Sequence, residues 1–336
     1  MPAVRISDIY EPTVWKDHDS LASVEKTAFV QSGVMVSNPV LDAKAADGGR
    51  MIELPFWKDL AVTDPNISSD DPAVRAVPEK IGTGVQVARV SHLNKSWQAT
   101  DLASQLAGAN AMFAIKDLTE AYWSKVLQRR AIATGRGILA DSIAHHGGDL
   151  VYDVSTDASG AATSAELFNS TAFTKAVFTL GDAFDQLGTI AMHSTVYSRL
   201  VQNDEIETIQ DSKTGLMVRL YKGHHVVQDD GMPAIAGTNR IKFISMIFGG
   251  GAFGFGKADP AVPVAVERDE QAANGAGVET LITRKQWIIH PRGFAFNSAS
   301  VAGISPTAPE LANGANWTRV AYERKQLPVA FLLTNG

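Results

Sequence analysis

The sequence predicts a protein of the α+β class. Two amphipathic segments, residues 98–137 and 170–187, carry apolar side chains at helical spacing, and short β-branched and aromatic runs are typical of strands. These elements alternate without the regular strand–helix repeat of a doubly wound parallel sheet, which favours α+β over α/β.

Composition excludes several classes of protein. The 336 residues include 30 basic and 36 acidic side chains, a formal charge of −6, which argues against tight non-specific binding of nucleic acid. The absence of cysteine excludes disulfides, thiolate metal sites and cysteine nucleophiles. No apolar run approaches the roughly 20 residues that span a membrane, and residues 1–20 lack the order of a signal peptide. We therefore expect a chain that is made inside a cell and is not exported by the usual route.

The first 48 residues predict an arm without sustained periodicity. Apolar side chains are scattered among polar ones, and Asn38-Pro39 indicates a break. A short helix is expected around residues 20–31. Because aromatic side chains such as Phe29 are poorly accommodated in water, we expect the arm to pack on another surface.

Residues 49–97 predict an extended β-hairpin. The run 50–57 predicts a strand that stops at Pro55, and residues 85–90 predict the returning strand. A polar stretch with three prolines separates the two. Compact domains rarely keep so long a connection without a use, so the hairpin is a candidate for contact with another molecule.

The clearest helical signal spans residues 98–137. Thr100 or Asp101 can cap its start, and Gly135-Arg136-Gly137 predicts its end. Apolar residues recur at i, i+4, i+7 and i+11, namely Leu102, Leu106, Ala109 and Phe113. A helix of about 34 residues is on the order of 50 Å long, so we expect it to support the elements around it.

The remaining chain predicts alternating strands and helices. The segment 170–187 forms one amphipathic helix, and residues 190–192 form a short buried strand before a helix that Ser194 caps. Further strands are expected at residues 216–221, 225–228, 240–248, 280–290 and 317–333.

The sequence contains no recognisable catalytic or metal-binding motif. The glycine-rich run 249–256 follows a strand but opens no helix, which favours a bend or loop over a phosphate site. His193, at a strand end, is interpreted as structural. The histidine pairs His145-His146 and His224-His225 lack metal-ligand spacing. The acidic pairs Asp70-Asp71 and Asp229-Asp230 lie in turn sequence and are interpreted as solvated turn residues, not as an acid/base pair. We therefore expect no catalytic residue, cofactor or metal ion.

Several short stretches occur in a fixed order along the chain. They are residues 180–183, 190–197, 221–223, 226–233, 248–256, 279–281 and 287–293. This set, with the arm, hairpin and long helix before it, resembles the major capsid proteins of tailed bacteriophages that have the Hong Kong 97-type fold. The resemblance covers nearly the whole chain.

The resemblance implies a division of the chain into five segments. These are an N-terminal arm (1–48), an extended loop over a neighbouring subunit (49–97), a peripheral domain with a spine helix (98–187), an axial domain (188–290) and a C-terminal return to the peripheral domain (291–336). The glycine-rich run then becomes a loop or turn of the axial domain.

The resemblance also implies a function and partners. The chain is expected to self-assemble into hexamers and pentamers of an icosahedral shell around packaged double-stranded DNA, without sequence-specific binding or membrane contact. A portal protein is an expected partner, with scaffolding or decoration proteins as further candidates, and assembly is expected in the host cytoplasm before the protein resides in the virion. Expected inter-subunit contacts in the hairpin are Phe56, Trp57, Lys58, Arg75 and Lys80.

Two alternatives remain open at this point. An encapsulin-like cellular compartment shares the fold but encloses enzymes instead of a genome. A soluble α+β enzyme without a recognisable site motif predicts a small oligomer with a polar pocket.

Overall fold

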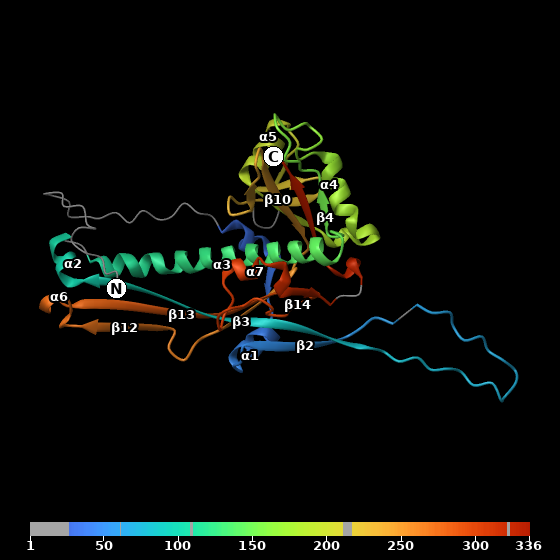
Figure 1. The fold of residues 1–336 in the computed structure, drawn as a ribbon, viewed down its shortest axis with the longest axis horizontal. Coiled ribbons are helices and arrows are strands. Elements are labelled where there is room, and N and C mark those ends of the chain that lie inside the picture. Colours follow the sequence, from blue (N-terminus) through green and yellow to red (C-terminus); the bar gives the residue numbers. More distant parts are fainter. Residues whose placement is uncertain (1–26, 61, 108–109, 211–216, 321–322) are drawn as a thin grey trace.

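The computed structural model describes residues 27–60, 62–107, 110–210, 217–320 and 323–336. A long helix, α3 (Ala111–His145), connects a narrow sheet at one end of the molecule to a compact body at the other (Figure 1). A thin hairpin projects beyond the body in the opposite direction to the narrow sheet. The α+β class is confirmed.

The narrow sheet has six strands in the order β1-β11-β13-β3-β2, with β12 also paired to β13. Only the β1–β11 pairing among these is parallel. Its strands are β1 (Met35–Ser37), β2 (Met51–Trp57), β3 (Thr83–Thr100), β11 (Phe253–Ala258), β12 (Val264–Asp269) and β13 (Val278–Pro291). The predicted stop at Pro55 is wrong, because Pro55 lies within β2 opposite Val85. An edge strand tolerates proline, since one of its sides has no ladder partner.

The compact body contains an eight-stranded sheet in the order β4-β16-β10-β5-β8-β7-β6, with β9 paired to β10. Its strands are β4 (Val151–Asp153), β5 (Thr189–Met192), β6 (Glu207–Gln210), β7 (Met217–Tyr221), β8 (His224–Gln228), β9 (Ala234–Ala236), β10 (Ile241–Phe248) and β16 (Val329–Thr334). The C-terminal strand β16 is buried along its whole length between β4 and β10. Shorter elements complete the chain: η2 (Val30–Val34), α1 (Pro39–Ala46), α2 (Asp101–Ala107), α6 (Ala272–Gly275), β14 (Phe294–Phe296), α7 (Ala308–Leu311), η4 (Gly314–Asn316), β15 (Trp317–Arg319) and η5 (Arg324–Gln326).

The two sheets draw on the same stretches of chain. Segment 188–290 contributes β5 to β10 to the eight-stranded sheet and β11 to β13 to the six-stranded sheet, and segment 291–336 contributes β16 to the body. The glycine-rich run was expected to be a loop or bend throughout, which is wrong for its second half, strand β11. A Cβ atom at Gly254 would lie 2.9 Å from Leu41 Cδ1, and one at Gly256 would lie 2.7 Å from Leu41 Cβ. These glycines therefore let α1 lie directly on the sheet.

The described part of the arm, from residue 27 onward, packs on the protein as expected. Phe29 and Val34 are fully buried, while the predicted helix at residues 20–31 lies largely outside the described residues. The break expected at Asn38-Pro39 is instead the start of α1. The side chain of Asn38 accepts a hydrogen bond from the Val40 amide at 2.9 Å, and Pro39 occupies the first turn.

Two further helix predictions need correction. The predicted helix 170–187 is α4 (Ser170–Val177) followed by the 3-10 segment η3 (Phe178–Gln186), because Gly181 takes a φ of +62°. The helix after β5, α5 (Ser194–Gln202), is capped by His193 and not by Ser194. His193 Nδ1 accepts from the Thr195 amide at 3.2 Å, which gives this histidine a structural role.

The long helix differs from the predicted one at both ends. The helical signal that begins at Asp101 belongs to the separate helix α2, and α3 begins after Asn110, whose side chain accepts from the Met112 amide at 2.9 Å. The predicted end at Gly135-Arg136-Gly137 is wrong, because the helix continues to His145.

Close packing explains the two glycines within α3. A Cβ atom at Gly135 would overlap Met246 of β10, and one at Gly137 would overlap both the Leu311 carbonyl and the Trp317 indole. Trp317 Nε1 donates to that same carbonyl at 2.7 Å. The helix therefore passes the C-terminal segment at a distance that only glycine permits. The stability gained from this close packing outweighs the ~1 kcal/mol that glycine costs in a helix.

We predict that Gly137→Ala lowers the free energy of unfolding by about 1–3 kcal/mol, although alanine is the better helix former. The added methyl group displaces Trp317 and its hydrogen bond to Leu311. Chemical denaturation of the purified chain measures the change. Gly250→Ala is the control, since nothing lies within 4 Å of the added atom. Equal stability of both variants would contradict the role given to Gly137.

Candidate assembly surfaces

The hairpin between β2 and β3 extends from the protein with little support. Beyond the paired strands, Lys58 N donates to the Gly82 carbonyl at 2.9 Å, and Thr63 Oγ1 contacts Glu79 Oε1 at 2.8 Å. Asn66 Nδ2 donates to the Val77 carbonyl at 3.2 Å. These contacts hold the two arms of the loop beside each other, and almost every described residue of the loop is exposed.

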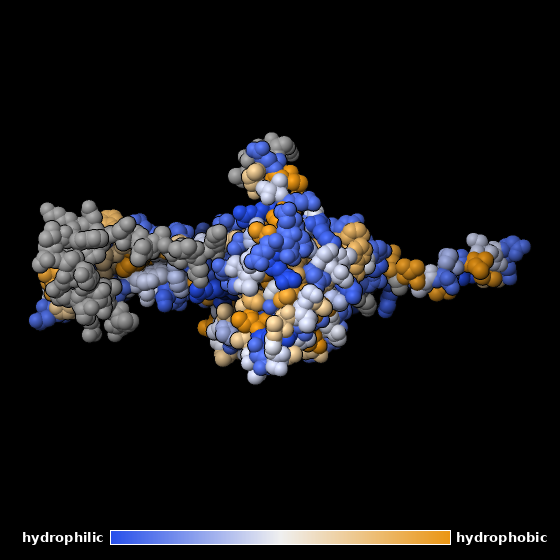
Figure 2. Space-filling view, turned by 90° about the horizontal axis from the view of Figure 1, so that it is seen from above, coloured by the Kyte–Doolittle hydropathy of each residue, from blue (hydrophilic) through white to orange (hydrophobic). Residues whose placement is uncertain are grey.

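The loop holds apolar side chains in solvent. Val62 is fully exposed, Ile67 is 93% exposed and Val77 is 71% exposed. Figure 2 shows this as apolar colour along the thin projection. Several exposed apolar side chains on one projecting segment make it a candidate for contact with another molecule. From its sequence the stretch is predicted to be polar, and these exposed aliphatic residues are not apparent there, because a residue in a loop shows no periodicity.

The five residues expected to make inter-subunit contacts lie at two places along the hairpin. Phe56 is half-buried, and its ring lies where a side chain at Gly84 would have to be. Trp57 beside it is 69% exposed. Lys58 follows at the base of the loop, whereas Arg75 and Lys80 are exposed further out. The hairpin thus presents two aromatic side chains and Lys58 at its base and separate basic side chains along the loop, not one compact site.

A second apolar surface lies at the far end of the molecule from the hairpin. The apolar stripe predicted from residue 102 onward is largely exposed: Leu102 is 41%, Leu106 59% and Phe113 64% exposed, and Ala109 lies outside the described residues. On β12 the side chains of Val264 and Val266 are also more than half exposed. This end of the molecule therefore has apolar side chains available for contact.

Aromatic side chains attach the N-terminal half of α3, here called its outer half, to the six-stranded sheet. Trp97, Tyr122, Trp123 and Trp287 form consecutive edge-to-face pairs with ring centroids 5.2, 5.4 and 5.5 Å apart. Trp123 Nε1 also donates to Thr283 Oγ1 at 3.0 Å. These contacts fix the helix on the sheet and leave its opposite face uncovered.

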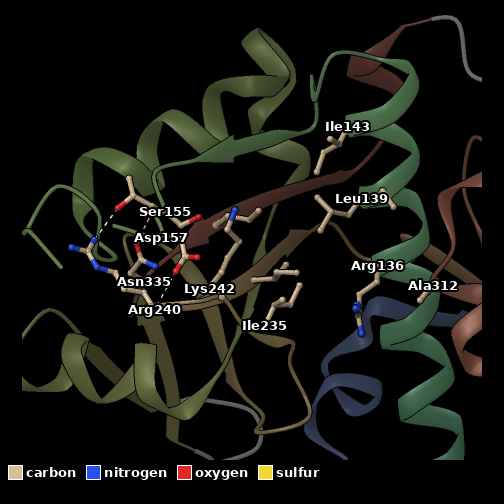
Figure 3. Close-up of a pocket in the computed structure, with 15 residues that line it drawn as sticks. Arg136, Leu139, Ile143, Ser155, Asp157, Ile235, Arg240, Lys242, Ala312 and Asn335 are labelled. Carbon is tan, nitrogen blue, oxygen red and sulfur yellow. Dashed lines mark hydrogen bonds between the residues drawn. The ribbon is translucent and has the colours of Figure 1, made fainter. Parts of the chain in front are cut away.

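A hollow of about 500 Å³ lies between the inner half of α3 and the β9–β10 hairpin (Figure 3). Leu139, Ile143 and Ile235 form much of its apolar lining. Of its polar groups, Asp157 accepts backbone N–H bonds from residues 238, 239 and 240 at 2.8–2.9 Å, which hold its pKa below the ordinary value. Arg240 pairs with Glu166 at 2.8 Å. These polar groups serve to join loop 155–157 to the body.

The other candidate groups also have structural surroundings. His145 Nδ1 lies 2.8 Å from the buried Asp141. Asp229 was expected to be a solvated turn residue, which is wrong: it is 2% exposed and accepts the amides of Phe29 and Gly231 at 3.0 and 2.8 Å. In the part of the chain that the structure describes, no group of three or more His, Cys, Asp or Glu residues is placed to hold a metal ion. Within the same residues no helix combines the length and apolarity needed to cross a bilayer.

Solved structures define the class of fold. The capsid of Ralstonia phage GP4 matches with a TM-score of 0.58 at 12% identity, over 84% of this chain and 92% of that chain. The Cyanophage Pam1 capsid asymmetric unit matches with a TM-score of 0.55 at 10% identity, over 96% of each chain. The fold is therefore the Hong Kong 97-type fold of phage capsid proteins, as the resemblance implied.

Sequence comparison gives the family. A family model described as major capsid protein 13-like matches residues 48–328. The major capsid protein of Bacillus phage SPP1 is 33% identical over 333 residues, which cover 98% of this chain and 97% of that relative. The chain belongs to the major capsid protein 13-like family of tailed-phage coat proteins.

Burial of His290 predicts an acid-sensitive fold. His290 is 5% exposed, contacts Gln86 Oε1 at 2.9 Å, and its burial lowers the pKa from 6.5 to about 4. Between these pH values the unfolded chain binds a proton that the folded chain does not. The contribution of neutral His290 to the free energy of unfolding is therefore complete above pH 6.5. As the pH falls from 6.5 to 4, this contribution decreases by up to about 3 kcal/mol.

Urea unfolding at pH 7 and pH 4.5 measures this difference. We expect His290→Gln, which cannot titrate, to show a smaller loss of stability between the two pH values than the unaltered chain. If both chains lose the same stability between pH 7 and pH 4.5, groups other than His290 cause the acid sensitivity.

Proposed function

We propose that this chain assembles into hexamers and pentamers that close into an icosahedral shell around packaged double-stranded DNA. Membership of a major capsid protein family supports the shell. The structural observation that carries the proposal is the hairpin, which holds Val62, Ile67 and Val77 in solvent. Side chains of this kind stabilise a protein only when another surface covers them.

The proposed partner of the hairpin is the adjacent subunit. Each arm of loop 58–82 has about 12 residues and can reach about 40 Å when extended, so it can lie across a neighbouring protein. Phe56 and Trp57 supply aromatic area at its base. Lys58, Arg75 and Lys80 are proposed to pair with acidic side chains of the neighbour, each at about 0–1 kcal/mol.

The exposed outer half of α3 and the six-stranded sheet are proposed as the peripheral domain, the surface on which a neighbour's hairpin lies. The body around the eight-stranded sheet is proposed as the axial domain, whose loops meet at the centre of a capsomer. We define the two domains by the two sheets and not by residue ranges, because one range, such as 188–290, contributes strands to both sheets.

The proposed contents and partners follow from charge and family. A net charge of −6 suits a wall that encloses DNA, because a basic lining would retain phosphates and oppose packaging and release. A portal protein is the proposed partner at the site of DNA entry, with scaffolding or decoration proteins as further candidates. Assembly is proposed to take place in the host cytoplasm.

Electron microscopy of the purified chain, alone or with phage factors, tests the proposal. We expect closed shells or separate capsomers, and shells from infected cells should contain nuclease-resistant DNA. Enzyme-filled shells without a genome would instead support the encapsulin-like alternative. Persistent small oligomers under all assembly conditions would contradict shell formation and favour the soluble enzyme.

We predict that the triple variant Val62→Ser, Ile67→Ser, Val77→Ser keeps the thermal unfolding midpoint of the unassembled subunit but loses most shell formation. These side chains make few contacts within their own chain, so only the assembled state depends on them. Light scattering during assembly measures the loss. Val40→Ser, at a residue 57% exposed on α1, is the control.

We also predict that deletion of residues 65–78 leaves a folded subunit that fails to assemble. The deletion removes the exposed tip and leaves the paired strands β2 and β3 intact. Circular dichroism monitors folding, and microscopy monitors assembly. Normal shells from this variant would show that the hairpin tip does not join subunits.

A further inference from the structure

A small internal cavity lies where α3, β3, β13 and the C-terminal segment meet. Its volume is about 10 Å³, which is room for one water-sized species. Two arginines, Arg89 and Arg130, line it together with Ser91 and His290, and the rest of the lining is apolar or aromatic. The cavity is separate from the hollow of Figure 3, which lies further along α3.

Both arginines are buried against neutral groups. Arg130 is 6% exposed, and its Nη2 donates to Ser91 Oγ at 2.7 Å and to the Pro306 carbonyl at 2.9 Å. Burial alone lowers its pKa to about 10. Arg89 is 9% exposed and donates to Ser298 Oγ at 3.0 Å and to the Ile304 carbonyl at 2.6 Å. None of these acceptors carries a charge.

The local charge is not balanced by an acid in the cavity. Glu310 is near enough to raise the pKa of Arg89, but its oxygens accept the amides of Ala302 and Thr307 at 2.9 and 2.7 Å. The positive charge of Arg50 instead lowers the pKa of Arg89. Arg89 Nε is buried and has no hydrogen-bond partner among the residues that the structure describes. Buried cations without a counter-charge are costly, and an orphaned donor adds to that cost.

We propose that this cavity binds one small inorganic anion of the size of chloride. The anion supplies a counter-charge to Arg130, whose pKa is shifted by burial alone, and an acceptor for the unpartnered Nε–H of Arg89. The small volume favours a monatomic anion over phosphate, sulfate or an organic acid. Arg89 lies on β3 opposite Met51 of β2, and both arginines hold the segment 298–306. A bound anion therefore joins the end of the β2–β3 pair that is distant from the loop, the helix α3 and the C-terminal segment.

Thermal unfolding of the full chain in sodium chloride and in sodium gluconate at equal ionic strength tests the site. Gluconate is too large for the cavity, so we expect chloride alone to raise the midpoint, by about 2–4 °C, with saturation. Arg130→Met should abolish the difference between the two salts. The control is Arg129→Met, which removes the same charge from an exposed residue of the same helix. This variant should keep the difference between the two salts. Equal midpoints in both salts, or an unchanged chloride effect in Arg130→Met, would overturn the proposal.

Crystals of the unaltered chain grown in sodium bromide give a test that does not depend on variants folding. We expect an anomalous peak within hydrogen-bond distance of the Arg89 and Arg130 side chains. A cavity that holds water and no bromide would overturn the assignment. Both results concern the subunit itself and are independent of whether it assembles into shells.

Discussion

The approach of α3 to the C-terminal segment at Gly137 is the contact on which the architecture depends. Past this point the helix is buried against β10, α7 and β15, while its other half lies on the six-stranded sheet through the aromatic pairs around Trp123. One rigid helix therefore joins two sheets that share few contacts of their own. The projecting hairpin and the compact body keep a defined relation because both are attached to this helix, through β3 and β10.

Burial is distributed unevenly along the molecule, and this suits a shell subunit. The body buries the strands β5, β10 and β16 of its sheet, whereas the hairpin and the outer end of α3 expose aliphatic and aromatic side chains. Each exposed group contributes little by itself. Many such contacts between subunits can close a shell while each remains weak enough to break and re-form during assembly.

The candidate site could be predicted only in part. The hairpin and its exposed Trp57, Arg75 and Lys80 are apparent from composition, because strand patterns flank a long proline-containing stretch. Val62 and Ile67 were missed, since an aliphatic residue in a loop shows no periodicity from which its exposure can be inferred. The cavity at Arg89 and Arg130 was also beyond reach, because the two residues are 41 positions apart and meet only through tertiary packing.

Local periodicity and short ordered motifs were enough to predict the α+β class, the positions of most strands, a long helix and the family. The roles of several residues became apparent only in the folded chain. Gly137 permits close packing and does not end its helix, Pro55 lies in an edge strand, and Asp229 is buried beneath the arm. The reason is physical: the effect of such residues is set by atoms that lie far away in the chain and adjacent in space.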